Sequence, residues 1–293
     1  MASVKHRVEY IFTRVFFGLI NMLSDKMADS FGKFLGRSAC KFLPSRKKIA
    51  LENLHHAFKD SKTESEYNDI VAKTFESIAQ TMIDLARSKR MSELQLSNKV
   101  HCPDLSAFDN ALKNGKGAVI ATAHYGNWEL AGAWIADLGY PLDIIIKVQS
   151  NPLVDAYILS LRQNFEYGII QIRNTTLRKV LQSLKQNRFI ILAADQHDPS
   201  GSLVLDFFGR KASIAKGPAT FARKQNCPII PIVMRRKDFD DYEVITTNGI
   251  YPNFDLDEKE DIIRMTKEYL NFLENVITRF PEQWMWTHRR WKL

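Results

Sequence analysis

The spacing of apolar residues divides the chain into a helical first third and an alternating remainder. Up to residue 100, apolar positions recur at the spacing of an amphipathic helix. Helices are predicted there over residues 29–42, 46–58 and 64–88, and a last helix over residues 258–280. Ser45 and Thr63 stand just before two of these segments and are expected to cap them.

From residue 118 onward, short apolar runs rich in β-branched residues alternate with helical stretches. Strands are predicted at residues 118–123, 143–148, 168–172, 189–194, 228–234 and 242–247, and helices at 129–138, 153–165, 177–185 and 215–224. This alternation is typical of a largely parallel sheet covered on both faces. We therefore predict an α/β fold in which helices sandwich a mixed, mostly parallel sheet, behind a helical N-terminal layer.

Composition supports one domain with an affinity for anions. The 293 residues are 45% hydrophobic, enough for a sizeable core, and no repeat or low-complexity linker divides them. We expect a single domain over residues 1–293, with a helical, membrane-facing layer at 1–100 and an α/β catalytic core at 101–293. The formal charge of +8 favours a phospholipid surface, a phosphorylated lipid, an acidic carrier protein or nucleic acid as partner. The three cysteines are widely spaced, which argues against disulfides and structural zinc.

The N-terminal segment, residues 8–23, is apolar but interrupted by Glu9 and Arg14. Its longest uncharged stretch, residues 15–24, is shorter than the roughly 20 residues that a spanning helix needs. No small-residue cleavage site follows, so we expect no signal peptide. We interpret the segment as an interfacial helix; the alternative is an ordinary helix docked on the core. The basic residues expected near lipid headgroups are Lys5, His6, Arg7, Arg14 and Lys26, and those expected in the lipid are Phe12, Phe16, Phe17, Leu19 and Ile20.

The strongest candidate for chemistry is the hexapeptide that runs from His124 to Glu129, between a predicted strand and a predicted helix. Within one helix this spacing would separate the two side chains by roughly 140°. A reversal at Gly126 and Asn127 can instead bring them together at the helix N-terminus. We therefore predict that His124 is a general base and that Glu129 orients it and stabilises its charge. The alternative is a strand-end histidine bonded to backbone, and a glutamate favoured by the helix dipole.

Four further residues occupy strand ends or helix starts, where α/β folds bind ligands. Asn127 either holds the turn or contacts substrate, and Asn151 begins the next predicted helix. Arg162 lies among apolar helix positions, and its alternative role is an ion pair with Glu166 one turn on. Asp195 ends a predicted strand. We assign all four to substrate binding or to ordering the site.

Two basic segments complete the candidates. Residues 205–212 lead toward a predicted helix, so Arg210, Lys211 and Lys216 either bind an anion at its N-terminus or form a solvated basic loop. Residues 281–292 place three tryptophans among basic residues. That pattern suits a membrane interface, a phosphorylated ligand or single-stranded nucleic acid. The alternative is that Trp284 and Trp286 close the core.

Five segments together resemble one family. They are residues 46–54, the His124–Glu129 motif, Asp195-Gln196, residues 207–212 and the terminal block 281–292. In this order they resemble the bacterial late acyltransferases of lipid A biosynthesis, the lauroyl and myristoyl transferases, within the lysophospholipid acyltransferase superfamily. The resemblance covers nearly the whole chain. The His-x4-Glu motif alone is shared with other glycerolipid acyltransferases, and the terminal block is more specific.

The resemblance implies an acyl-carrier-protein thioester as donor and a hydroxyl of a lipid A precursor as acceptor. It also implies a place on the cytoplasmic face of the bacterial inner membrane, peripheral or anchored by the N-terminus, with no cofactor, no metal and no nucleic acid. Family members often have a longer, more continuous apolar N-terminal segment than this chain. The Pro-Glu-Gly motif of the glycerolipid branch is missing, which weighs against glycerol-3-phosphate as acceptor.

Three other functions are compatible with parts of the sequence. The same chemistry could act on another glycolipid or an aminolipid. A non-enzymatic, basic membrane-binding protein would explain the charge, but it gives no reason for the His124–Glu129 motif. A metal hydrolase is the weakest alternative, because one histidine and one glutamate fall short of the three protein ligands usual at catalytic zinc.

Overall fold

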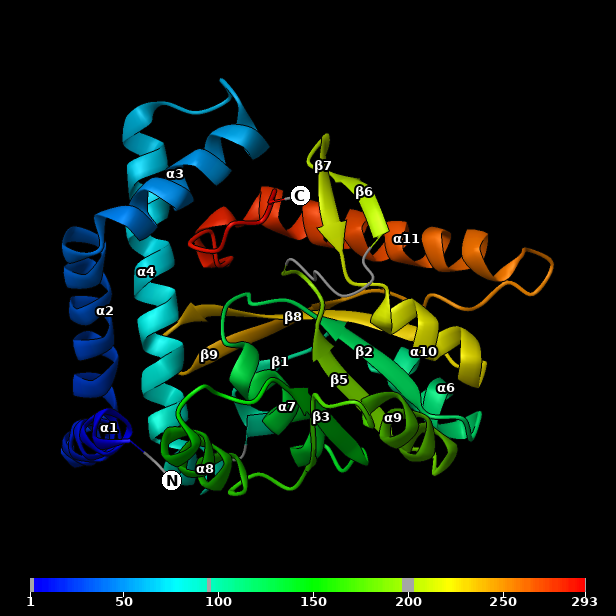
Figure 1. Ribbon diagram of the computed structural model, residues 1–293, viewed down its shortest axis with the longest axis horizontal. Coiled ribbons are helices and arrows are strands. Elements are labelled where there is room, and N and C mark those ends of the chain that lie inside the picture. Colours follow the sequence, from blue (N-terminus) through cyan, green and yellow to red (C-terminus); the bar gives the residue numbers. More distant parts are fainter. Residues whose placement is uncertain (1–2, 94–95, 197–202, 293) are drawn as a thin grey trace.

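The computed structural model of the chain describes residues 3–93, 96–196 and 203–292 (Figure 1). Its N-terminal part is helical, as the apolar spacing predicts. The helices are α1 (Val4–Met22), α2 (Asp25–Phe42), α3 (Pro44–Phe58), α4 (Glu64–Ala86) and α5 (Ser88–Glu93). Thr63 caps α4, and its capping box with Glu66 confirms that prediction. The Ser45 cap is wrong, because α3 already starts at Pro44, whose fixed φ and missing N–H suit the first helical position.

A seven-stranded sheet forms the centre of the molecule, in the order β1-β9-β8-β2-β5-β3-β4. Its strands are β1 (Val100–His101), β2 (Ala118–Thr122), β3 (Leu142–Ile146), β4 (Gly168–Gln171), β5 (Phe189–Ala193), β8 (Ile229–Asp238) and β9 (Asp241–Thr246). Every pairing is parallel except that of β8 with β9. The predicted α/β class with a mixed, mostly parallel sheet is confirmed.

Helices cover both faces of this sheet, so its central strand β2 is buried along its whole length. The remaining helices are α6 (Ser106–Lys113), α7 (Trp128–Asp137), α8 (Pro152–Arg162), α9 (Thr176–Lys185), α10 (Gly217–Gln225) and α11 (Glu258–Arg279). Along β2, Val119 and Ala121 join the core under α9, α10 and α11, and Ala118 and Ile120 join the core under α6 and α7. Side chains two positions apart therefore face the same side.

A β-hairpin replaces the basic loop that the sequence suggested. It consists of β6 (Leu203–Phe207) and β7 (Arg210–Ile214). Its turn residues Phe208 and Gly209 both have positive φ, as a two-residue hairpin turn of type I′ requires. Arg210 therefore contacts His56, and Lys211 pairs with Asp206. Arg210 and Lys211 therefore do not flank the start of α10, and the three-residue anion site considered there is not formed. Of the three basic residues, Lys216 alone stands at that helix start, as its N-cap residue.

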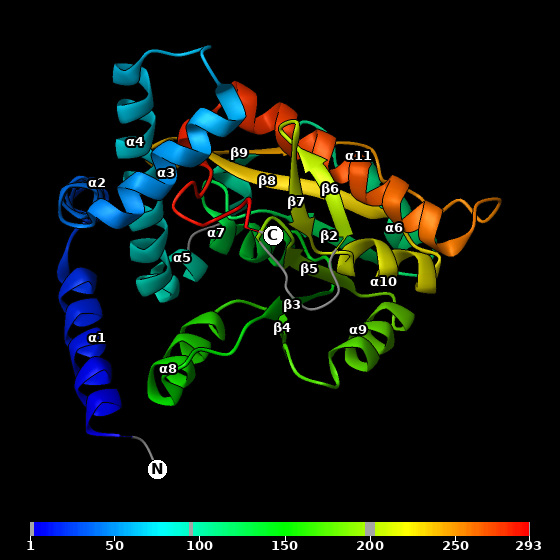
Figure 2. The ribbon, with the colours of Figure 1, turned by 45° about the horizontal axis from the view of Figure 1, so that its top comes forward.

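The helix α1 lies beside α8 at one end of the molecule (Figure 2). Phe12 and Leu19 are 71% and 59% exposed, but Phe16 and Phe17 are half-buried. Ile20 is 1% exposed and packs against α2 and α4, so its predicted place in the lipid is wrong. Among the described residues, we find no helix that combines the length and the apolar character needed to cross a membrane.

The C-terminal tryptophans belong to the core. Trp284, Trp286 and Trp291 are all buried, and the first two pack edge to face with ring centroids 4.6 Å apart. The interpretation that Trp284 and Trp286 close the core is confirmed. Their rings are therefore not surface groups for lipid or nucleic acid.

Candidate active site

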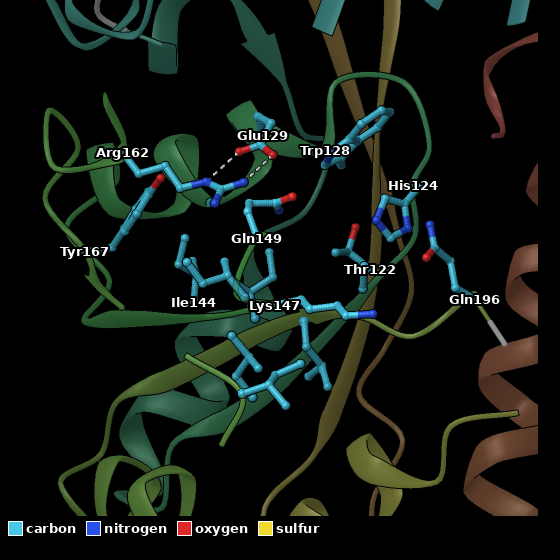
Figure 3. Close-up of a pocket in the computed structure, with 17 residues that line it drawn as sticks. Thr122, His124, Trp128, Glu129, Ile144, Lys147, Gln149, Arg162, Tyr167 and Gln196 are labelled. Carbon is cyan, nitrogen blue, oxygen red and sulfur yellow. Dashed lines mark hydrogen bonds and ion pairs between the residues drawn. The ribbon is translucent and has the colours of Figure 1, made fainter. Parts of the chain in front are cut away.

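An open cleft of about 320 Å³ lies where β2, β3 and β5 end, at the edge of the sheet where α/β folds bind ligands (Figure 3). Its polar lining consists of Thr122, His124, Glu129, Lys147, Gln149, Arg162 and Gln196. Its aromatic and apolar lining includes Trp128, Tyr167, Ile144, Ile145, Ile146, Ile172, Ile191, Leu192 and Ala193. The cleft thus combines a few polar groups with a largely apolar wall.

Within the cleft, the imidazole of His124 is held by Asp195. The Nδ1 atom of His124 lies 2.8 Å from Oδ1 of Asp195, although 71 residues separate the two in the chain. The sheet register explains this contact. Thr122 is paired with Ala193 across the parallel strands β2 and β5, so the residues two positions further on leave the sheet side by side. With its proton on Nδ1, the ring donates to Asp195 and leaves Nε2 as a base.

Three donors converge on the Asp195 carboxylate, which is buried. In addition to the His124 ring, the backbone N–H of His124 donates to Oδ2 at 3.0 Å and the indole N–H of Trp284 donates to the same oxygen at 2.9 Å. Burial alone would raise the pKa of Asp195. The charge and hydrogen bonds of His124, with the bond from Trp284, outweigh it and lower the pKa. Asp195 is therefore a fixed carboxylate beside the imidazole.

The pKa of His124 is raised by its acidic neighbours. Burial alone would lower it, but the charge and hydrogen bond of Asp195 and the more distant charge of Glu129 outweigh that effect. The side chain remains 24% exposed, on the wall of the cleft. The imidazolium formed after a proton is taken is thus stabilised electrostatically.

Glu129 does not contact His124, contrary to the prediction from the hexapeptide. Its carboxylate instead accepts two hydrogen bonds from Arg162 at the end of α8, from Nε at 3.1 Å and Nη2 at 2.8 Å (Figure 3). The reversal at Gly126 does bring both ends of the motif to one cleft. However, Glu129 in the first turn of α7 faces α8, and the strand neighbour Asp195 occupies Nδ1 of His124. The suggested pair of Arg162 with Glu166 is replaced by this bidentate pair with Glu129.

Asn127 is buried and does not line the cleft, so its position does not support the contact with substrate that was considered for it. Its Oδ1 accepts from the backbone N–H of Leu130 and caps α7, and its Nδ2 donates to Asp84 of α4 at 2.7 Å. Arg236 binds the same carboxylate. Of the two roles considered for Asn127, the structural one fits: it ties the turn between His124 and α7 to the N-terminal helices.

Asn151 is likewise absent from the cleft lining, so the prediction that it binds substrate is not supported by its position. It caps α8 by accepting from the N–H of Leu153. Its Nδ2 donates to the carbonyl of His6 and to Oε2 of Glu9, at 3.0 and 2.8 Å. Asn151 therefore fastens α1 to α8, the helix whose last residue is Arg162.

The C-terminal segment supports the strand end that carries His124. The N–H of Met285 donates to the carbonyl of His124, and the N–H of Gly126 donates to the carbonyl of Gln283. Sequence reasoning did not connect this segment with the site, nor Trp284 with Asp195. The cluster of tryptophans in residues 281–292 was the one hint in the sequence. A sequence alone does not distinguish a tryptophan that only packs in the core from one whose indole N–H donates to a carboxylate.

No group of three or more His, Cys, Asp or Glu side chains with the geometry of a metal site occurs among residues 3–93, 96–196 and 203–292.

Comparison with known proteins adds an independent line of evidence. Residues 2–293 match the family described as "Bacterial lipid A biosynthesis acyltransferase". The chain is 24% identical to the lipid A biosynthesis palmitoleoyltransferase of Escherichia coli K12, over 89% of this chain and 83% of the relative. It is 26% identical to the lipid A biosynthesis lauroyltransferase of the same organism, over 88% and 83%. A phosphatidylinositol mannoside acyltransferase of Mycolicibacterium smegmatis is 21% identical, over 76% and 73%.

Proposed function

Because the chain belongs to the bacterial lipid A biosynthesis acyltransferase family, we propose that it moves a fatty acyl group from an acyl-carrier-protein thioester to a hydroxyl of a lipid A precursor. Family membership makes it an O-acyltransferase of the lipid A type. We propose in addition that the donor is a thioester, that His124 is the base and that the enzyme works at a membrane. The observation that carries its chemistry is the contact of His124 with Asp195 in an open cleft.

In the proposed reaction, Nε2 of His124 removes the proton of the acceptor hydroxyl as its oxygen attacks the thioester carbonyl. The imidazolium that forms is stabilised by Asp195, which also fixes the tautomer. The tetrahedral intermediate then expels the thiolate of the carrier, and the imidazolium returns the proton to that sulfur. The acyl group ends as an ester on the acceptor, and the enzyme returns to its starting protonation state.

Glu129 and Arg162 take a supporting part in this proposal. Their side chains are mostly buried, and the two hydrogen bonds between them join α7 to α8 across the cleft. Glu129 also raises the pKa of His124 through its charge, without contact. Thus Asp195 orients the base, and Glu129 shapes the wall and adds to the negative potential.

We propose a location at a phospholipid membrane, on the cytoplasmic face of the inner membrane, and the surface of α1 supports attachment to a membrane. Exposed apolar side chains follow α1 and the start of α2: Val4, Val8, Ile11, Phe12, Val15, Leu19, Met22 and Met27. Burial of such side chains in the interfacial region is favourable, and the net positive charge favours anionic lipid. Since α1 is fastened to α8, a lipid acceptor lying in that membrane would be close to the cleft. The same positive charge would attract the acidic carrier protein.

Mass spectrometry of lipid A tests the proposed function. A strain that lacks this protein should gain one acyl chain per lipid A molecule when the wild-type gene is restored, and not when the His124→Gln variant is restored. The M. smegmatis relative acts on a different glycolipid by its name, so the same extracts should be searched for other glycolipids and aminolipids. If lipid A is unchanged and one of these lipids gains an acyl chain, the acceptor is that lipid and the proposed acyl transfer still holds. No acylated product of any kind would contradict the proposal.

A further inference from the structure

Thr122 carries a buried hydroxyl in the wall of the cleft. It is the last residue of β2 and stands two positions before His124, on the side of the sheet that Ala118 and Ile120 also face. Its side chain lines the cleft, and the whole residue is only 5% exposed. The hydroxyl oxygen has no hydrogen-bond partner among the described residues.

An unpartnered hydroxyl in such a position is costly to keep. A buried hydroxyl without a hydrogen bond lowers stability, because its hydrogen bonds to water are lost and not replaced. Two other buried threonines, Thr81 and Thr266, donate to backbone carbonyls at 2.9 and 2.6 Å. Thr74 also lacks a partner in the described part of the chain, but it lies on α4 and is not among the cleft residues. Thr122 therefore differs from these three threonines in pairing a free hydroxyl with a place in the site.

The cleft changes character at Thr122. In Figure 3, the Thr122 side chain lies next to the His124 ring, on the side that leads past Lys147 and Gln149 toward Ile144. An acyl chain would lie along the aliphatic wall, because burying its methylenes there is favourable. The carbonyl that ends this chain would then come to the boundary, next to the base and the threonine hydroxyl.

We propose that the Thr122 hydroxyl donates a hydrogen bond to the carbonyl oxygen of the acyl group and stabilises the oxyanion that forms there. This inference rests on the proposed acyl transfer. When the acceptor oxygen bonds to the carbonyl carbon, the π electron pair of C=O moves onto the oxygen beside Thr122. The C–S bond then breaks as that pair re-forms C=O. Thr122 keeps its own proton throughout.

Two matched pairs of variants isolate the hydroxyl. Thr and Val differ by a hydroxyl against a methyl group, and Ser and Ala differ by the hydroxyl alone. We expect Thr122→Val and Thr122→Ala to lower kcat by about 10²-fold with little change in KM, because the bond strengthens only as charge develops. Thr122→Ser should keep kcat within about tenfold of the wild type. Thr74→Val is the control for an equally unpartnered buried hydroxyl outside the cleft, and we expect no change in its kcat.

Thermal melting separates a catalytic from a packing role. Removing an unpartnered hydroxyl should leave the Tm of Thr122→Val equal to that of the wild type or higher. A kcat of Thr122→Val within about threefold of the wild type would overturn the inference. If that variant fails to fold, equal kcat values for Thr122→Ala and Thr122→Ser would overturn it instead. The wild-type enzyme is the control that separates the two failures. If it transfers no acyl group from a carrier thioester, the proposed function itself is contradicted; if it does, a loss or retention of kcat in the variants tests the role of Thr122.

Discussion

Arg162 holds the carboxylate of Glu129 through two hydrogen bonds, from Nε at 3.1 Å and from Nη2 at 2.8 Å. This pair connects the first turn of α7 to the last residue of α8, and both side chains line the cleft. Since α8 is also the helix to which α1 is fastened, the pair links the acid of the His124 motif to the apolar N-terminal helix. Its strength can be measured without any assay of activity.

A double-mutant cycle measures the Glu129–Arg162 interaction. Glu129→Gln and Arg162→Gln each leave the partner charge mostly buried and unpaired, so each should lower the free energy of unfolding by about 1–3 kcal/mol. The double variant should be less destabilised than the sum of the two, with a coupling of about 0.5–3 kcal/mol by urea denaturation. Additive losses within about 0.3 kcal/mol would show that the two groups do not interact in solution.

The pH dependence of activity should report the contact between Asp195 and His124. Catalysis requires neutral His124, so kcat/KM should rise with pH through the pKa of His124. Asp195 and Glu129 raise that pKa, so the midpoint should lie above about 6.5, the ordinary value for histidine. Asp195→Asn removes the nearer charge and should move the midpoint to lower pH, together with a lower maximal rate.

Glu129→Gln provides the comparison for this pH profile. Glu129 acts on His124 only through its charge at a distance, so its removal should move the midpoint in the same direction but by less. Two results would contradict the assignment of Asp195 as the orienting carboxylate. One is a midpoint of the pH profile that does not move in Asp195→Asn, and the other is a midpoint that moves further in Glu129→Gln than in Asp195→Asn.

Asn127 should be important for stability. Asn127→Ala removes the cap of α7 and a hydrogen bond to the buried Asp84. The two losses together should lower the free energy of unfolding by about 2 kcal/mol or more. Asn110→Ala, at an exposed position of α6, should change it by less than about 0.5 kcal/mol. Equal effects of the two substitutions in urea unfolding would refute this role of Asn127.

The exposed face of α1 should determine binding to phospholipid vesicles. Replacing both Phe12 and Leu19 by serine should lower the partition coefficient onto anionic vesicles by about tenfold or more, because each side chain contributes about 1.5–3 kcal/mol when buried. Val204→Ser is the control, since Val204 is 55% exposed but lies on the hairpin strand β6. Vesicle sedimentation measures both. Equal losses in the control, or none in the double variant, would contradict docking by α1.

Apolar periodicity was sufficient to predict the sheet strands from residue 118 onward, because each strand is a short apolar run that is visible in the local sequence. It was also sufficient to place His124 and Asp195 at strand ends. Their contact could not be predicted, because it depends on β2 and β5 being neighbours in the sheet. The roles of Asn127 and Asn151 depend on partners in α4 and α1, which lie 43 and 142 residues away in the chain. The hairpin at residues 203–214 was missed because Phe208 is an unusual residue for positive φ.

The rate of acyl transfer by His124→Gln tests the central claim most directly. Purified wild-type and variant enzymes would be compared in a single turnover with acyl-carrier-protein thioester and a lipid A precursor, after circular dichroism shows equal folding. If His124 is the base, the variant should be slower by about 10²–10⁴-fold. Transfer by the folded variant within a few-fold of the wild-type rate would contradict the account.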